Sequence, residues 1–163
     1  MSATDDLLRN AERYAERFHD DELPRRPSKR VAVLACMDAR LIPTRVLGLE
    51  EGEAHVIRNA GGVVSDDAIR SLSISQHLLG TEEVVLLQHT DCGLLTFTDD
   101  EFKRMLEDEA GEAPPWPVHT FSDLEDNVRE SIERIRNSPF IPNTGSVRGF
   151  VYEVETGKLR EVG

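Results

Sequence analysis

The chain has 163 residues, a length suited to one hydrophobic core and short for two, so we expect a single domain over residues 1–163. Its 31 acidic residues against 19 basic ones give a formal charge of −12, which argues against nucleic acid and anionic membranes as partners. Apolar stretches are only a few residues long and no basic leader precedes one, which predicts a cytoplasmic protein without a membrane span.

An N-terminal helix is predicted because apolar residues recur at spacings of three and four, at Leu7, Ala11, Tyr14, Ala15 and Phe18. We expect this helix to lie across the core or to reach over a partner subunit. Pro24 and Pro27 exclude its continuation. Residues 1–27 are therefore predicted to form a helical arm and a connector.

Strands and helices alternate through the rest of the chain. Apolar runs predict strands at 31–36, 54–58, 83–88, 147–154 and 159–162. Helical patterns lie between them, over 43–48, 65–79, from 98 to a break at the proline-rich run 114–117, and 122–136. This order favours an α/β fold of three layers, α/β/α, with a mostly parallel four-stranded sheet plus a short antiparallel strand at the C-terminus.

Two of these helices have a predicted start. Thr98 with Glu101, and Ser122 with Glu125, have the spacing of capping boxes, in which side chains at the first turn satisfy free backbone N–H groups. The helix that begins near Thr98 is expected to turn three apolar residues inward, Phe102, Met105 and Leu106.

Reactive side chains follow the first strand. Residues 31–36 are apolar on both faces, as in a central parallel strand, and the run Cys36-Met37-Asp38-Ala39-Arg40 stands at its carboxyl end. Because side chains of an extended segment alternate, Cys36, Asp38 and Arg40 are predicted to point the same way.

A second group follows the strand at 83–88. His89 and Cys92 are three positions apart, a spacing at which one turn can bring both to a single metal ion. Ligands in such sheets collect beyond the carboxyl ends of the strands. If the first and third strands are neighbours, Cys36, His89 and Cys92 converge. Cys36 and Cys92 could instead pair as a disulfide, but we expect reduced thiols.

Two cysteines and a histidine suit zinc. Structural zinc normally has four protein ligands, and no fourth Cys or His lies near either motif. We expect the remaining histidines to be ordinary polar or interfacial residues, namely His19, His55, His77 and His119. A zinc ion with an open position binds water and lowers its pKa toward neutrality.

Asp38 and Arg40 then acquire predicted roles. Asp38 lies close enough to the expected metal to accept a hydrogen bond from its hydroxide, or to fill the fourth position, and filling it at low pH is a further hypothesis. Arg40 would hold the carboxylate off the metal by a bidentate ion pair. After the second strand, Gly61 and Gly62 predict either a close approach of the backbone or a plain tight turn.

With these residues assembled, the chain resembles the β-class carbonic anhydrases, above all their short bacterial and archaeal branch. The family's C-x-D-x-R motif corresponds to Cys36–Arg40 and its H-x-x-C-G motif to His89–Gly93. Arg58-Asn59-Ala60-Gly61-Gly62 is similar to the family's loop after the second strand. The resemblance covers about residues 28–154.

The resemblance implies reversible hydration of CO2 to bicarbonate and a proton, by attack of hydroxide bound to Zn2+. It implies Cys36, His89 and Cys92 as metal ligands and Asp38 and Arg40 as the catalytic dyad. It also implies a homodimer or an assembly of dimers. Plant-like members carry a Gln between the two motifs, where this chain has Glu50, so that substrate contact does not carry over.

Two alternatives stay open. One is a hydrolase of carbonyl sulfide or carbon disulfide on the same scaffold, with the same ligands and a different pocket. The other is a non-enzymatic zinc-stabilised binding protein, which predicts a closed site with four ligands. The walls of the pocket are unassigned, with Val63, Val64 and residues of a second subunit as candidates.

Overall fold

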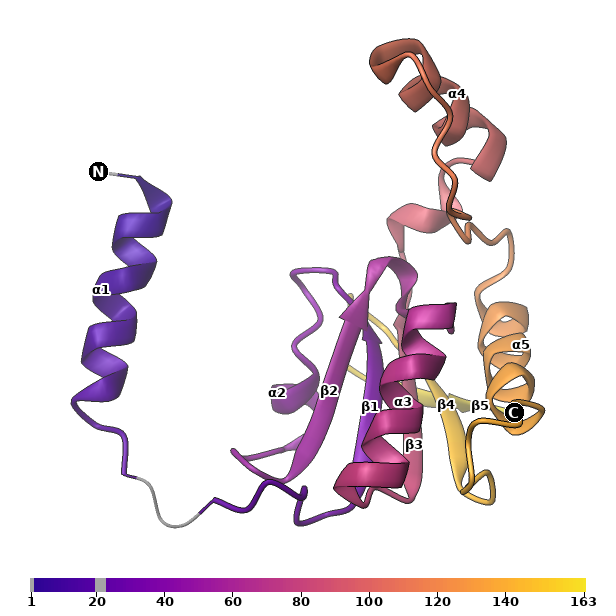
Figure 1. Ribbon diagram of the computed structural model, residues 1–163. Helices are drawn as coiled ribbons and strands as arrows, with labels where there is room; N and C mark the ends of the chain where they lie inside the picture. The colour runs from indigo at the N-terminus through magenta and orange to yellow at the C-terminus, as the bar shows by residue number, and fades with distance from the viewer. Residues whose placement is uncertain (1, 20–22) are drawn as a thin grey trace.

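The computed structural model describes residues 2–19 and 23–163, so residues 20–22 of the predicted connector lie outside the described residues. Its centre is a five-stranded sheet in the order β2-β1-β3-β4-β5 (Figure 1). The first four of these strands are parallel, and β5 runs antiparallel to β4. This confirms the predicted sheet, whose strands are β1 (Val31–Cys36), β2 (Ala54–Asn59), β3 (Glu83–His89), β4 (Val147–Tyr152) and β5 (Leu159–Val162).

Strand register brings the two motifs to one edge of the sheet. On β1, Val31 pairs with both Ala54 of β2 and Glu83 of β3, so the three strands start level. They also end within one residue of one another, because β1 and β2 have six residues and β3 has seven. The predicted neighbours are therefore adjacent, and the segments after them leave the sheet side by side.

Helices cover both faces of the sheet. In Figure 1, α3 and α5 lie on one face, and the short α2 lies on the other. Two 3-10 turns, η1 (Ala60–Gly62) and η2 (Gly93–Leu95), follow β2 and β3. The three-layer prediction is confirmed, with helices α1 (Ala3–Ala15), α2 (Pro43–Leu47), α3 (Asp66–Leu79), α4 (Asp99–Ala110) and α5 (Leu124–Arg136).

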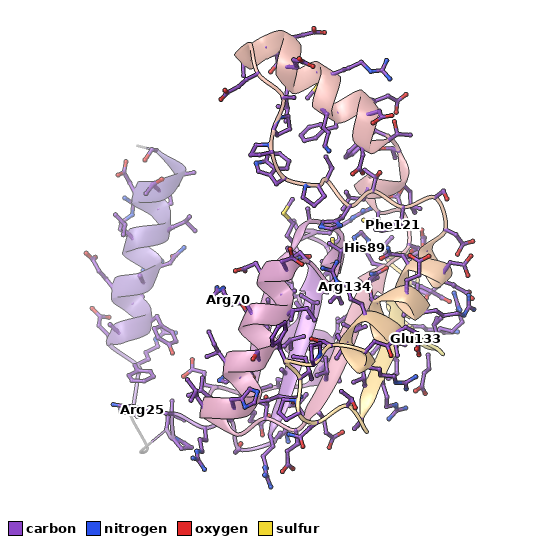
Figure 2. All side chains as sticks on the ribbon, turned by 45° about the vertical axis from the view of Figure 1, so that its right-hand side comes forward. Arg25, Arg70, His89, Phe121, Glu133 and Arg134 are labelled. Atoms are coloured by element: carbon purple, nitrogen blue, oxygen red, sulfur yellow. The ribbon has the colours of Figure 1, made fainter. Side chains whose placement is uncertain are left out.

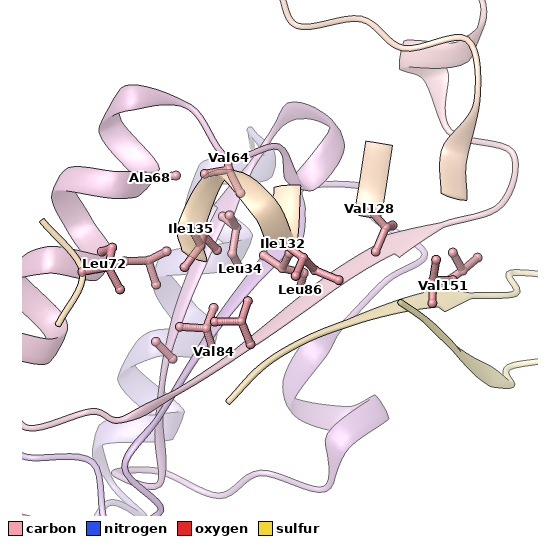
Figure 3. Close-up of a cluster of buried hydrophobic side chains, with 14 residues drawn as sticks. Leu34, Val64, Ala68, Leu72, Val84, Leu86, Val128, Ile132, Ile135 and Val151 are labelled. Atoms are coloured by element: carbon pink, nitrogen blue, oxygen red, sulfur yellow. The ribbon is translucent and has the colours of Figure 1, made fainter. Parts of the chain in front are cut away.

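The main core lies between the sheet and the α3–α5 layer. Leu34 and Leu86 of the central strands are fully buried there and meet Leu72 of α3 and Ile135 of α5 (Figure 3). Each buried leucine contributes about 2 kcal/mol of transfer free energy. This packing makes β1 and β3 rigid supports for the residues at their ends.

Local hydrogen bonds explain where most helices begin. Thr98 and Glu101 form the predicted capping box of α4. The corresponding prediction for α5 is wrong, because Asp123 is its N-cap and accepts a hydrogen bond from the backbone N–H of Asp126. A carboxylate caps a helix as well as a hydroxyl does, and α5 therefore begins one residue later than predicted.

Two helices project from the sheet, α1 and α4 (Figures 1 and 2). None of the described residues of α1 is buried, so of the two placements predicted for this helix, the one across this chain's core is wrong. All of α4 is described and none of its residues is buried either; Met105 is 45% exposed rather than turned into the core. Both helices thus keep an apolar stripe that the sheet does not cover.

Candidate active site

The three predicted metal donors meet at the carboxyl edge of the sheet. Cys36 ends β1, His89 ends β3, and Cys92 follows after a tight turn. All three are buried, with exposed fractions of 4% or less. Their donor atoms lie within 4.8 Å of one another, and no fourth His, Cys, Asp or Glu joins this group among the described residues. The predicted convergence is confirmed.

His89 is oriented by its backbone neighbour. Its Nδ1 lies 2.7 Å from the carbonyl oxygen of Thr90, and because a carbonyl only accepts, Nδ1 carries the proton. The other ring nitrogen, Nε2, then faces Sγ of Cys36 at 3.2 Å. Such a hydrogen bond behind the imidazole fixes the tautomer in which Nε2 can bind a metal.

The donors also polarise one another. A hydrogen bond from the Cys92 thiol, together with contacts from His89, lowers the pKa of Cys36 to about 4. The same contact with Cys36 raises the pKa of Cys92. Burial disfavours the charged imidazole, but the contacts with Cys36 and the Thr90 carbonyl outweigh it and raise the pKa of His89. Two free sulfur atoms, one of them a ready thiolate, and one imidazole make a donor set for a soft metal.

Asp38 and Arg40 form a side-on pair next to these donors. Arg40 donates from Nε to Oδ1 at 3.0 Å and from Nη2 to Oδ2 at 2.9 Å. Oδ2 of Asp38 lies 3.6 Å from Nε2 of His89. The guanidinium hydrogen bonds hold the pKa of Asp38 well below its usual range. The carboxylate is therefore ionised and faces the donor group, in the arrangement predicted from the sequence.

Asp91 is a further neighbour of Arg40, and its role was not predicted from the sequence. Its carboxylate accepts from Nη1 of Arg40 at 2.7 Å, and its carbonyl oxygen accepts from Nη2 at 2.9 Å. Asp91 has a left-handed φ of 53°, which turns its backbone toward Arg40. The sequence does place Asp91 between His89 and Cys92, and a charged residue in that turn must lie beside the site.

The glycines after β2 make the predicted close approach. Gly62 has a φ of 62°, and a Cβ atom there would lie 2.7 Å from the backbone nitrogen of Cys36 and 3.2 Å from the carbonyl oxygen of Leu87. A side chain at this position would displace the ends of both β1 and β3. Gly62 is therefore required for the spacing of the metal donors, beyond forming a turn.

A cavity of about 540 Å³ opens above the donors. Cys36, Asp38 and Cys92 lie at its polar end, and aromatic side chains of the projecting α4 region form its apolar wall, namely Phe97, Phe102 and Trp116. In Figure 2, His89 lies at the upper end of the sheet, below α4. Val63 and Val64, the predicted candidates for the wall, are buried and do not line this cavity.

Known proteins resemble the chain over its length. A family model described as carbonic anhydrase matches residues 31–159. Beta-carbonic anhydrase 1 of Mycobacterium tuberculosis is 57% identical over 162 residues, 99% of each chain. A carbon disulfide hydrolase of an Acidianus species is 37% identical, covering 82% of this chain and 78% of the relative.

The crystal structure of carbonic anhydrase from Streptococcus mutans has a TM-score of 0.93 and 44% identity, and covers 100% of this chain and 99% of that one. The shared fold extends to the segments that carry Cys36, Asp38, His89 and Cys92. The chain belongs to the β-carbonic anhydrase family.

Proposed function

We propose that the chain is a zinc-dependent carbonic anhydrase that interconverts CO2 and bicarbonate, with release or uptake of a proton. The observation that carries the proposal is the buried group of Cys36, His89 and Cys92 with Asp38 beside it, at the end of an apolar cavity. It is supported by 57% identity to a carbonic anhydrase over nearly the whole chain.

Zinc is the metal that fits this donor set best, because two sulfur donors and one imidazole are typical of zinc sites. Cys36, His89 and Cys92 would hold it. When bound with a position open, zinc acts as a Lewis acid that lowers the pKa of a water molecule toward neutrality. The absence of a fourth donor among the described residues favours an open site over a structural one, and so counts against a zinc-stabilised binding protein.

The chain's own residues would orient the reaction. Oδ2 of Asp38 faces the donors and, besides the hydrogen bond from Arg40, has a second lone pair that can accept a hydrogen bond from the attacking oxygen. That hydrogen bond would fix the direction in which the attacking oxygen presents its own lone pair. Arg40 holds both carboxylate oxygens and so prevents Asp38 from turning into the open position. The apolar wall at Phe97 and Trp116 offers a site for uncharged CO2 and excludes water.

Hydrolysis of carbon disulfide is the competing activity, because a relative of that name is 37% identical. CO2 and CS2 are both linear and apolar, so the same donors suit both. A side-by-side assay of the zinc-loaded protein with CO2 and with CS2 separates the two. We expect rapid CO2 hydration and at most slow release of sulfide; sulfide release without CO2 hydration would overturn the proposal.

We further propose a homodimer or an assembly of dimers, in which the arm at residues 1–27 packs on a second subunit. The support is an amphipathic α1 that leaves Leu7 67% and Leu8 59% exposed. A cytoplasmic location is also proposed, on the ground that both cysteines are free thiols. Within the described ranges, no helix has the length and apolar character needed to cross a membrane.

A further inference from the structure

Arg58 is the next-to-last residue of β2. Its side chain extends to the segment that carries Cys36 and Asp38. Its Nη2 donates to the carbonyl oxygens of Cys36, Asp38 and Leu41, each at 2.8 Å, and its Nε donates to the Cys36 carbonyl at 3.0 Å. One guanidinium therefore contacts three carbonyl groups within a stretch of six residues.

This stretch has left the sheet and needs support of its own. β1 ends at Cys36, and beyond it the backbone is tied to β2 at one further point, where the N–H of Met37 donates to the carbonyl of Asn59 at 2.8 Å. Arg58 adds contacts on both sides of Met37. The peptide groups that flank Asp38 are thereby held while its side chain extends toward the donors.

Arg58 has no ion-pair partner among the described residues, unlike Arg40, which lies between two carboxylates. Its hydrogen bonds go to carbonyl groups alone, and the carbonyls belong to the residues that set the course of the loop. A planar guanidinium with five N–H groups can span several acceptors at once, whereas a lysine ammonium is a compact point charge on a flexible stem.

We propose that Arg58 is a positioning residue of the reaction, which acts through Asp38. By fixing the carbonyls of Cys36, Asp38 and Leu41, it sets the direction from which the Asp38 carboxylate approaches the donor group. This inference rests on the proposed carbonic anhydrase activity. Cys36 and His89 are held by the ends of β1 and β3, so Arg58 is required for the orientation of the Asp38 carboxylate and not for metal retention.

The test compares Arg58→Lys with the wild-type protein by zinc content, urea unfolding and stopped-flow CO2 hydration. We expect about one zinc per chain, a kcat lower by about tenfold, as a displaced catalytic group produces, and a nearly unchanged KM. Arg136→Lys is the matched control, because Arg136 also donates to a backbone carbonyl, that of Val147 at 3.3 Å, far from the donors. It should leave kcat unchanged.

A double-mutant cycle with Asp38→Ala decides whether Arg58 acts through Asp38. In the Asp38→Ala background, Arg58→Lys should change kcat by less than about twofold. An equal tenfold loss in both backgrounds, a loss of zinc in step with activity, or wild-type kcat in Arg58→Lys would overturn the proposal. So would failure of both Arg58→Lys and Arg58→Gln to fold. Turnover of the wild-type protein in the same assay tests the proposed function separately.

Discussion

Oδ2 of Asp38 lies 3.6 Å from Nε2 of His89, beside the predicted metal donors. Arg40 holds both of its oxygens, and Asp91 holds the other edge of the guanidinium. A surface ion pair contributes little to stability. The Asp38–Arg40 pair instead fixes an orientation, because it keeps the ionised carboxylate beside the donors and prevents it from rotating freely.

Asp38→Ala should therefore retain zinc and lose most of its CO2 hydration, with a kcat lower by about a hundredfold because the attacking oxygen is no longer oriented. Zinc analysis and stopped-flow kinetics on the same sample measure both quantities. Asp67→Ala is the control, since Asp67 also pairs with an arginine, Arg70 at 2.8 Å, on the exposed side of α3. Wild-type turnover in Asp38→Ala would reduce Asp38 to a structural residue.

The donors should behave differently from Asp38. Cys36→Ser and His89→Ala each remove one of three ligands, so both variants should lose zinc and activity together. Metal analysis after dialysis, with circular dichroism to verify folding, measures the effect. A folded Cys36→Ser protein that still carries one zinc per chain and turns over CO2 would show that Cys36 is not a ligand.

At the scale of elements, the turn η1 packs closely against the ends of β1 and β3. Gly62 and Gly48 have the same φ, 62°, but a Cβ at Gly48 would meet nothing within 4 Å. Gly48→Ala should cost about 1–2 kcal/mol for the left-handed backbone alone. Gly62→Ala should cost at least about 2 kcal/mol more, because it also drives Cys36 out of place.

Urea unfolding of the two variants measures this difference. Zinc content should fall only in Gly62→Ala, since that substitution displaces a donor. Equal free energies of unfolding for Gly62→Ala and Gly48→Ala would mean that the close approach contributes nothing.

The sequence is sufficient to predict the elements whose causes are local. The capping box at Thr98 and Glu101 depends on residues three apart, and it is confirmed. The convergence of Cys36 with His89 follows from parallel strands that end within one residue of one another, which the βαβ order implies. Motifs at strand ends are thus predictable once the sheet order is known.

The walls of the cavity were not predictable in this way. Trp116 lies in a proline-rich stretch whose pattern indicates only that a helix ends, yet it lines the cavity above the donors. Phe102 has the spacing of a core residue, but α4 projects from the sheet, and Phe102 packs instead against Phe97, with ring centroids 5.5 Å apart. The direction of a projecting helix depends on the turn before it and on neighbours far along the chain.

At the scale of the whole molecule, α1 is an amphipathic helix that buries none of its residues against the described part of the chain. Leu7 and Leu8 are more than half exposed, and Tyr14 donates a hydrogen bond to Glu51. Exposed apolar stripes of this kind usually mark an interface. That residues 1–163 form one domain, with residues 1–27 as an arm, stays a prediction with which this arrangement agrees.

Leu7→Asp should shift the protein toward the monomer, because it places a charge in the proposed interface. Size-exclusion chromatography with light scattering, run over a range of concentrations, measures the mass. Asn10→Asp is the control, since it adds the same charge to α1 beside Arg13. A wild-type protein that is monomeric at all concentrations would refute the dimer, and an unchanged mass in Leu7→Asp would remove α1 from the interface.

The proposed activity depends on one metal ion held by Cys36, His89 and Cys92. Stopped-flow CO2 hydration by the zinc-loaded protein, by the same protein stripped with a chelator, and after zinc is restored tests it most directly. Turnover should disappear with the metal and return at about one zinc per chain. Full turnover in metal-free protein, or none in zinc-loaded protein, would contradict this prediction.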